Sequence, residues 1–147
     1  MPIPLLSLFR EIAPLLVKRR RLDEYPAGQG GANPVDEARR RIREISPRDL
    51  GKFTELPLIV DVRGQDEFFS GHIKGAKNVS GDFSEMAVFE IAPDRARPIL
   101  VYCAAGNRGA LVANNLQKMG YLNVFSLRGG LSSWLEAGGV VETSSTV

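Results

Sequence analysis

Apolar and polar positions alternate between two periods along residues 44–142. Short apolar runs rich in branched side chains, typical of buried strands, alternate with segments whose apolar positions recur at helical spacing. The expected strands are 56–62, 75–79, 97–103 and 123–127, and the expected helices are 64–71, 83–91, 108–120 and 130–138. This alternation predicts an α/β fold with a mostly parallel sheet and helices on both faces. Ligands of such sheets bind where strands end and helices begin.

The first third of the chain follows a different pattern. Residues 1–22 have apolar positions at helical spacing and a basic end, and this run is too short and too polar to span a bilayer. We expect a helix that packs on its own domain, pairs with a second copy or lies on a membrane surface. Residues 23–34 are typical of a linker, and 35–45 are typical of a helix with a solvated charged face. The expected organisation is a helical extension and linker over 1–42 and one domain over 43–147.

Composition narrows the function classes. The 147 residues include one cysteine and one histidine, which excludes an intramolecular disulfide framework and makes a structural zinc site implausible. The lone cysteine favours a reducing compartment, so we expect a cytoplasmic protein. A net charge of +2 gives no reason to expect a nucleic-acid partner.

The cysteine stands at the place where a ligand is expected. Cys103 ends the predicted strand 97–103, and the sequence AAGNRG separates it from the next helix. Small residues and two glycines let successive backbone N–H groups point inward, and the start of the helix adds a positive dipole. Such surroundings favour a thiolate and therefore a nucleophile. The competing interpretation is a buried cysteine that only fills space at a strand end.

The spacing of the nearby arginine limits the chemistry. Cysteine phosphatases place an arginine six residues after the cysteine, whereas Arg108 follows Cys103 by five and position 109 is glycine. The shorter loop predicts a cradle sized for one sulfur atom on the cysteine and not for a tetrahedral phosphate. The residues therefore favour attack on sulfur.

Three motifs together resemble the rhodanese (sulfurtransferase) family in a single-domain form. They are LIVDVRGQDEFFSGHIKGAKNV over 58–79, VYCAAGNRGA over 101–110 and GYLNVFSLRGGLSSW over 120–134. The resemblance covers about residues 44–142 and leaves 1–42 outside. It implies a three-layer fold with a mostly parallel, five-stranded sheet, to which the N-terminal helical extension is added.

The resemblance also implies a mechanism. Cys103 would take the outer sulfur of a donor such as thiosulfate as a persulfide and pass it to cyanide, a thiol or a sulfur-carrier protein. The loop that binds the donor and stabilises the persulfide would comprise Ala104, Ala105, Gly106, Asn107, Arg108 and Gly109. No metal or organic cofactor is implied.

Two positions depart from the common family pattern. Ala104 stands where many members have arginine or another polar residue, and Gly109 stands where serine is frequent. Both differences remove side chains that would touch the donor, which leaves the preference for thiosulfate open. We expect Arg63 and Arg128 to restore positive charge at the mouth of the site.

Further residues have expected supporting roles. Asp61 and Arg63 are expected to form a buried polar network that holds the loops, and His72 to satisfy nearby backbone groups. Trp134 is expected in the core, and Asn107 is expected to cap the following helix.

A second function class stays open beside the enzyme. A non-catalytic rhodanese-like binding module, positioned by its N-terminal helix, is compatible with the long extension. The intact Cys103, Gly106 and Arg108 favour the sulfurtransferase.

Overall fold

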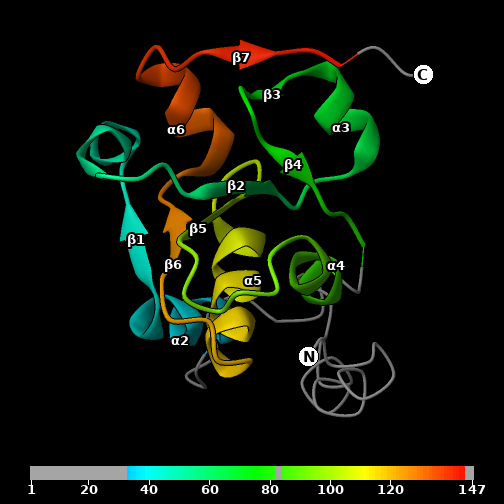
Figure 1. The fold of residues 1–147 in the computed structure, drawn as a ribbon. Helices are drawn as coiled ribbons and strands as arrows, with labels where there is room; N and C mark the ends of the chain where they lie inside the picture. The colour runs from blue at the N-terminus through cyan, green and yellow to red at the C-terminus, as the bar shows by residue number, and fades with distance from the viewer. Residues whose placement is uncertain (1–32, 82–83, 145–147) are drawn as a thin grey trace.

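A five-stranded parallel sheet forms the centre of the molecule, in the strand order β1-β6-β5-β2-β4 (Figure 1). The computed structural model describes residues 33–81 and 84–144. The strands are β1 (Arg43–Ile45), β2 (Leu58–Asp61), β4 (Lys77–Asn78), β5 (Ile99–Tyr102) and β6 (Val124–Leu127). All of them run in one direction, so their carboxyl ends meet at one edge of the sheet, as the alternating sequence pattern predicts.

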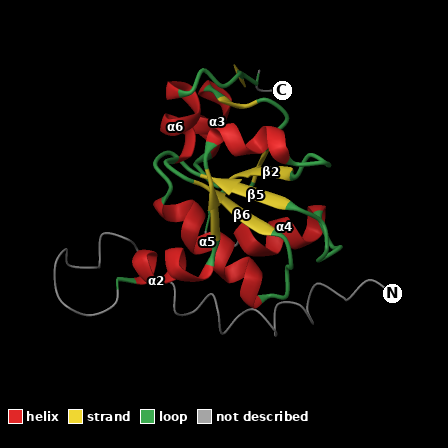
Figure 2. Ribbon diagram, turned by 90° about the vertical axis from the view of Figure 1, so that its left-hand side faces the viewer, coloured by secondary structure: helices red, strands yellow, loops and turns green. Residues whose placement is uncertain are grey.

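Helices cover both faces of this sheet and complete three layers (Figure 2). One face carries α2 (Pro34–Arg41), α4 (Ser84–Ile91) and α5 (Asn107–Lys118), and the other carries α3 (Gln65–Ser70) and α6 (Gly130–Glu136). A 3-10 helix, η2 (Pro47–Lys52), follows β1. The predicted α/β architecture with a mostly parallel sheet is therefore confirmed.

The side chains of strand β5 alternate between two hydrophobic cores, one on each face of the sheet. Ile99 and Val101 face the core shared with α4 and α5, whereas Leu100 and Tyr102 face the core shared with α3 and α6. The alternation follows from the two-residue period of a strand. Cys103 continues the first series, so its side chain lies on the α5 side of the sheet.

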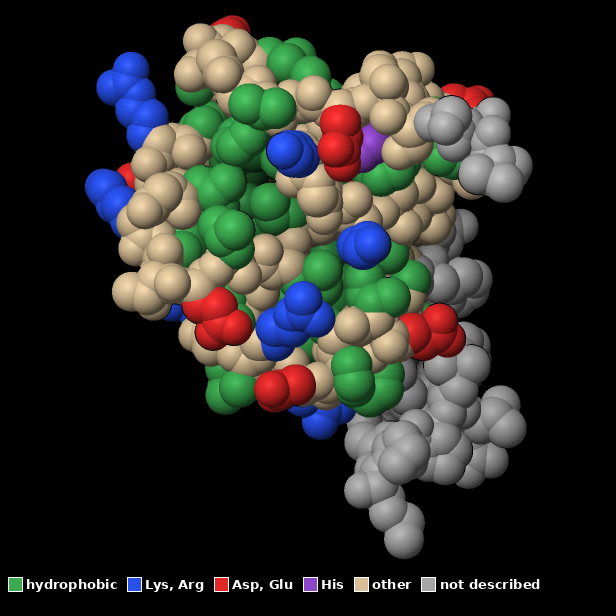
Figure 3. All heavy atoms as spheres, turned by 45° about the horizontal axis from the view of Figure 1, so that its top comes forward, with side chains coloured by type: hydrophobic (Ala, Val, Ile, Leu, Met, Phe, Trp, Pro, Cys, Tyr) green, Lys and Arg blue, Asp and Glu red, His purple; other side chains and the backbone are tan. Residues whose placement is uncertain are grey.

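A second, two-stranded antiparallel sheet joins the C-terminal end of the described chain to the region after α3. It consists of β3 (His72–Ile73) and β7 (Val141–Glu142). Leu135, Val140 and Val141 are exposed near it. Figure 3, which brings this end forward, shows charged side chains beside the histidine and hydrophobic side chains to the left of it. The sequence pattern did not indicate this sheet, because two-residue strands carry no measurable period.

The structure corrects the prediction of one helix over 35–45. Helix α2 ends at Arg41, Ile42 has an extended backbone, and residues 43–45 pair with β6 as strand β1. Charged residues continue through this segment and resemble a helix face, but the pairing with β6 decides the conformation. Tertiary context overrides local propensity here.

The structure leaves the N-terminal predictions largely untested. The helix expected over 1–22 and most of the linker expected over 23–34 lie outside the described residues. Helix α2 packs on α5, with Val35 and Ala38 buried between them. Asn33 caps α2, because its Oδ1 accepts a hydrogen bond from the Val35 N–H at 2.9 Å. The boundary between residues 42 and 43 stays a prediction.

Candidate active site

Cys103 lies at the carboxyl end of β5, where the sequence places it. Its side chain is nearly buried, with 6% of the residue exposed. Its Sγ accepts a hydrogen bond from the Gly106 N–H at an N···S distance of 3.0 Å. Residues 103–106, called the Cys103 loop below, thus turn back on the sulfur before α5 begins at Asn107.

Positive backbone φ angles shape the loop and its neighbour. Gly106 has a φ of +105° and precedes the first residue of α5. Gly129 and Gly130, at the start of α6, have φ values of +76° and +59°. A side chain at Gly130 would overlap Cys103 O and lie 2.8 Å from the Ala104 carbonyl, so this approach requires glycine. The closing motif of the sequence thus contacts the cysteine loop directly.

The start of α6 holds the carbonyl groups of the Cys103 loop. The Leu131 N–H donates to Cys103 O at 2.8 Å, and the Ser132 N–H donates to Ala104 O at 3.1 Å. Because a trans peptide places its N–H opposite its C=O, the N–H groups of Ala104 and Ala105 point away from α6. The Gly106 N–H is the loop donor that contacts the sulfur.

Asn107 and Arg108, the two polar side chains of the predicted loop, contact different partners. Arg108 is exposed, and its Nη1 lies 3.4 Å from Val62 O at the end of the neighbouring strand β2. Asn107 does not cap α5, which corrects the prediction. It is the first helical residue, and its Oδ1 instead accepts a hydrogen bond from Arg39 Nη2 at 2.8 Å.

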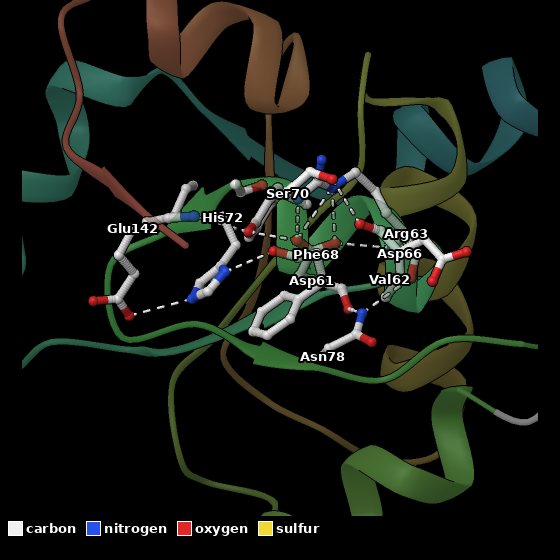
Figure 4. Close-up of polar contacts among 12 residues, drawn as sticks. Asp61, Val62, Arg63, Asp66, Phe68, Ser70, His72, Asn78 and Glu142 are labelled. Atoms are coloured by element: carbon white, nitrogen blue, oxygen red, sulfur yellow. Dashed lines mark hydrogen bonds and ion pairs between the residues drawn. The ribbon is translucent and has the colours of Figure 1, made fainter. Parts of the chain in front are cut away.

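A buried polar network fixes the strand ends beside the cysteine (Figure 4). Asp61 is fully buried and accepts hydrogen bonds from Arg63 Nη2 at 2.7 Å and from the Tyr102 hydroxyl at 2.6 Å. Arg63 also donates to Gly71 O, and Tyr102 accepts from the Ile73 N–H. The predicted supporting role of Asp61 and Arg63 therefore agrees with the geometry.

Burial and this pairing shift the titration of the network. Burial, reinforced by the hydrogen bond to Asp61, raises the pKa of Tyr102 well above its ordinary value. For Arg63, burial alone would lower the pKa, but the hydrogen bond and charge of Asp61 outweigh it and raise the pKa. The Tyr102 hydroxyl and the Arg63 guanidinium thus stay protonated, and neither serves as a base.

The two arginines expected at the mouth of the site differ in exposure. Arg63 is 94% buried by its contacts with Asp61 and Gly71, so it does not supply charge at the mouth, contrary to the expectation. Arg128 is exposed at the end of β6, and its N–H donates to Ile45 O. Of the two, only Arg128 has a side chain free to face solvent.

His72 has a structural role. Its Nδ1 lies 2.8 Å from Phe68 O, its Nε2 lies 3.2 Å from Glu142 Oε1, and its ring stacks on Phe68 (Figure 4). The imidazole satisfies a backbone group, as predicted, and also ties β7 to β3. Trp134 packs against the core on the α3 and α6 side, as predicted, but it is only half-buried, and its Nε1 donates to Val140 O.

Sequence reasoning missed one residue of the site. Arg39 lies in the segment expected to be a solvated face outside the domain, yet it reaches Asn107 at the start of α5. No signal in the sequence links residues 39 and 107, because the contact depends on how α2 packs on α5.

Neither a metal cluster nor a membrane-spanning helix is found in the described part of the chain. Residues 33–81 and 84–144 contain no group of three His, Cys, Asp or Glu side chains arranged to hold a metal ion. Within the same ranges, no helix has the length and apolarity needed to cross a membrane.

Comparisons with known proteins agree with this geometry. The family model of the Rhodanese-like domain matches residues 37–137. Thiosulfate sulfurtransferase GlpE of Shewanella oneidensis is 36% identical over 97 residues, which are 65% of this chain and 94% of that protein. GlpE of Coxiella burnetii is 35% identical over 95 residues, which are 65% of this chain and 86% of that protein.

Solved structures share the fold. The polysulfide-sulfur transferase homodimer of Wolinella succinogenes matches 76% of this chain and 85% of its own, with a TM-score of 0.64 and 27% identity. A Rhodopseudomonas palustris protein of unknown function, described as a "Possible Tyrosine Phosphatase", matches 80% of this chain and 99% of its own, with a TM-score of 0.64 and 26% identity.

Proposed function

The chain belongs to the Rhodanese-like family, and from this premise we propose that it is a sulfurtransferase that works through a persulfide on Cys103. The sulfane sulfur would come from a donor such as thiosulfate and pass to a thiophilic acceptor. One observation carries the proposal: Cys103 Sγ sits at the carboxyl end of β5 and accepts the Gly106 N–H at 3.0 Å. The same site binds the negative charge of a thiolate and of the persulfide that replaces it.

The first half-reaction follows from this arrangement. The Cys103 thiolate attacks the outer sulfur of thiosulfate, the S–S bond of the donor breaks, and its electron pair leaves with sulfite. The product is Cys103–S–S⁻. Backbone N–H groups of the Cys103 loop and the start of α5 stabilise the negative charge without reorganising, because α6 already holds the loop carbonyls.

The second half-reaction returns the enzyme to its starting state. The acceptor attacks the outer sulfur of the persulfide, and the Cys103 thiolate leaves. Cyanide becomes thiocyanate, and a thiol becomes a persulfide. A covalent intermediate between two half-reactions predicts ping-pong kinetics. The chemistry uses no cofactor.

The donor site is lightly charged, which bears on the substrate. Ala104 and Ala105 are exposed and carry no charge, so Arg108 is the one side-chain cation within residues 104–109. A donor with less charge than thiosulfate, such as mercaptopyruvate with its single carboxylate, would fit this site as well. A thiol or a sulfur-carrier protein in the cytoplasm is our proposed acceptor, and a homodimer or a peripheral membrane contact through residues 1–22 is the proposed role of the extension.

Intact mass measurement tests the proposal. We expect the protein to gain one sulfur atom after anaerobic incubation with thiosulfate, and Cys103→Ser to gain none. Cyanide should remove the added sulfur and release thiocyanate, whereas oxidation to sulfinic acid adds a similar mass that cyanide does not remove.

Two other outcomes would replace the proposal. If neither thiosulfate, polysulfide nor mercaptopyruvate gives an adduct, the protein is a non-catalytic binding module. Turnover of an aryl phosphate that requires Cys103 would establish a phosphatase instead, although the five-residue spacing to Arg108 argues against it.

A further inference from the structure

Arg39 occupies an unexpected place in helix α2. Val35 and Ala38 form the buried face of this helix against α5, and Arg39 follows Val35 by four residues on the same stripe. Its neighbour Arg40 is exposed. An arginine on the inner stripe of a short helix therefore extends toward α5, and its side chain is 37% exposed.

The guanidinium of Arg39 makes one hydrogen bond in the described structure, and it is to the start of α5. Nη2 donates to Asn107 Oδ1 at 2.8 Å. Nε is inaccessible to solvent, has no hydrogen-bond partner and lies 3.8 Å from Glu44 Oε1. Nη2 would also lie 3.7 Å from a Cβ atom built on Gly106. Arg39 thus contacts the residue directly after the one whose N–H donates to Cys103 Sγ.

The helix dipole of α5 disfavours the charge of Arg39 at this place. The amino end of a helix is positive, so a cation there is disfavoured. The first turn of α5 contains no acidic residue and adds Arg108. Glu44, whose Oε1 lies 3.8 Å from Nε, compensates part of this charge. The hydrogen bond to Asn107 directs the guanidinium to the start of α5.

We propose that Arg39 is a positioning residue for the Cys103 loop and acts through Asn107. The hydrogen bond holds the first residue of α5, and thereby the left-handed Gly106 whose N–H faces the sulfur. Its consequence for sulfur transfer rests on the function proposed above. The positioning itself is measurable on the thiol, because the reaction of Cys103 with iodoacetamide requires no sulfur donor.

A double-mutant cycle tests this inference. Arg39→Gln and Asn107→Ala are each expected to slow persulfide formation from thiosulfate about tenfold, a modest cost for a reacting group moved by part of an ångström. The rate of Cys103 alkylation should change in both variants too. The double variant should lose no more than either single one, because both changes remove the same hydrogen bond. Arg39→Lys, which keeps a donor for Asn107 Oδ1, should recover most of the rate.

The matched control is Arg40→Gln, which removes the same charge one position away on the exposed side of α2 and should leave both rates unchanged. Urea midpoints of all variants show whether any loss follows from unfolding. If Arg39→Gln does not fold, Asn107→Ala still tests the contact with Arg39 in place. Additive losses, or an unchanged rate in Asn107→Ala, would overturn the inference. Altered alkylation without any persulfide in the wild type would support the positioning role and reject the sulfurtransferase.

Discussion

At the scale of single residues, Cys103 owes its surroundings to backbone groups more than to side chains. Its sulfur faces the Gly106 N–H, and its own carbonyl accepts the Leu131 N–H. The three residues that follow it are two alanines and a glycine, none of which has a bulky side chain. The site therefore depends on residues without bulky side chains, and Gly130 is the clearest case.

Replacing Gly130 with alanine should damage both the stability and the chemistry. The φ of +59° costs a non-glycine residue about 1–2 kcal/mol. The new methyl group would also overlap Cys103 O, a backbone atom that cannot move aside without moving the loop. We expect the free energy of unfolding to fall by more than about 2 kcal/mol and persulfide formation to be lost.

Gly138→Ala is the control for that experiment. Gly138 has a φ of +79° but no atom within 4 Å of a built Cβ, so only the backbone cost applies. Urea unfolding of the two variants separates the overlap from the conformational cost. Equal losses in stability, with persulfide formation intact in Gly130→Ala, would show that the contact with the Cys103 loop is unimportant.

At the scale of elements, the site is assembled where three segments meet. Strand β5 supplies the cysteine, helix α5 supplies the positive dipole, and the start of α6 binds the loop carbonyls. Strand β7 pairs with β3, whose Ile73 packs in the core on the α3 side of the sheet. Glu142 of β7 accepts a hydrogen bond from the Gly75 N–H and lies 3.2 Å from His72 Nε2, and so ties β7 to the region after α3.

Acid should loosen β7 before it unfolds the domain. The Gly75 N–H donates to Glu142, and His72 and Lys74 add positive charge, so the pKa of Glu142 lies below its ordinary value of 4.5. The ionised form is thus favoured by the folded state. Its contribution is present above the ordinary pKa and is lost as the pH falls through the lower folded-state pKa.

Hydrogen exchange of the Lys74 amide measures this effect, because that N–H donates to Val140 O beside β7. After correction for the intrinsic rate, protection should fall as Glu142 is protonated. Glu142→Gln should show reduced protection already at neutral pH, whereas Glu136→Gln, on exposed α6, should not. Protection that is independent of pH in the wild type would contradict the role of Glu142.

At the scale of the whole molecule, helix α2 packs on α5, whose start adjoins the Cys103 loop. The family match begins at residue 37, inside this helix, and the hydrogen bond from Arg39 reaches α5. A truncation before α2 and a truncation after α2 therefore test separately what the preceding residues and the helix contribute.

Truncation should have two different outcomes. The sequence predicts that removal of residues 1–34 spares sulfur transfer, but Asn33 and Pro34 belong to the start of α2, so we place the harmless cut after residue 32. A chain that starts at Asn33 should transfer sulfur at the full rate. A chain that starts at Arg43 lacks Arg39 and the buried Val35 and Ala38, and should be slower and less stable.

Rates of persulfide formation and urea midpoints for both truncated chains check this prediction. A large loss of rate in a folded chain starting at Asn33 would give residues 1–32 a catalytic role. An unchanged rate in the chain starting at Arg43 would remove α2 from the site.

The sequence by itself determined the layers of the fold and the place of Cys103. Both follow from local order along the chain: the two-residue period of β5, the helical period of α5 and the glycines between them are properties of neighbouring residues. The buried role of Asp61 and Arg63 was also foreseeable, since a charged pair directly after an apolar strand must find partners when buried.

Only the tertiary structure decided the rest. Residues 43–45 form a strand because β6 offers them hydrogen bonds, and Asn107 accepts from Arg39 because α2 packs across α5. The approach of Gly130 to Cys103 and the pairing of β3 with β7 join residues far apart in the chain. Such contacts depend on how whole elements are arranged in space, and the pattern of a single segment does not determine that arrangement.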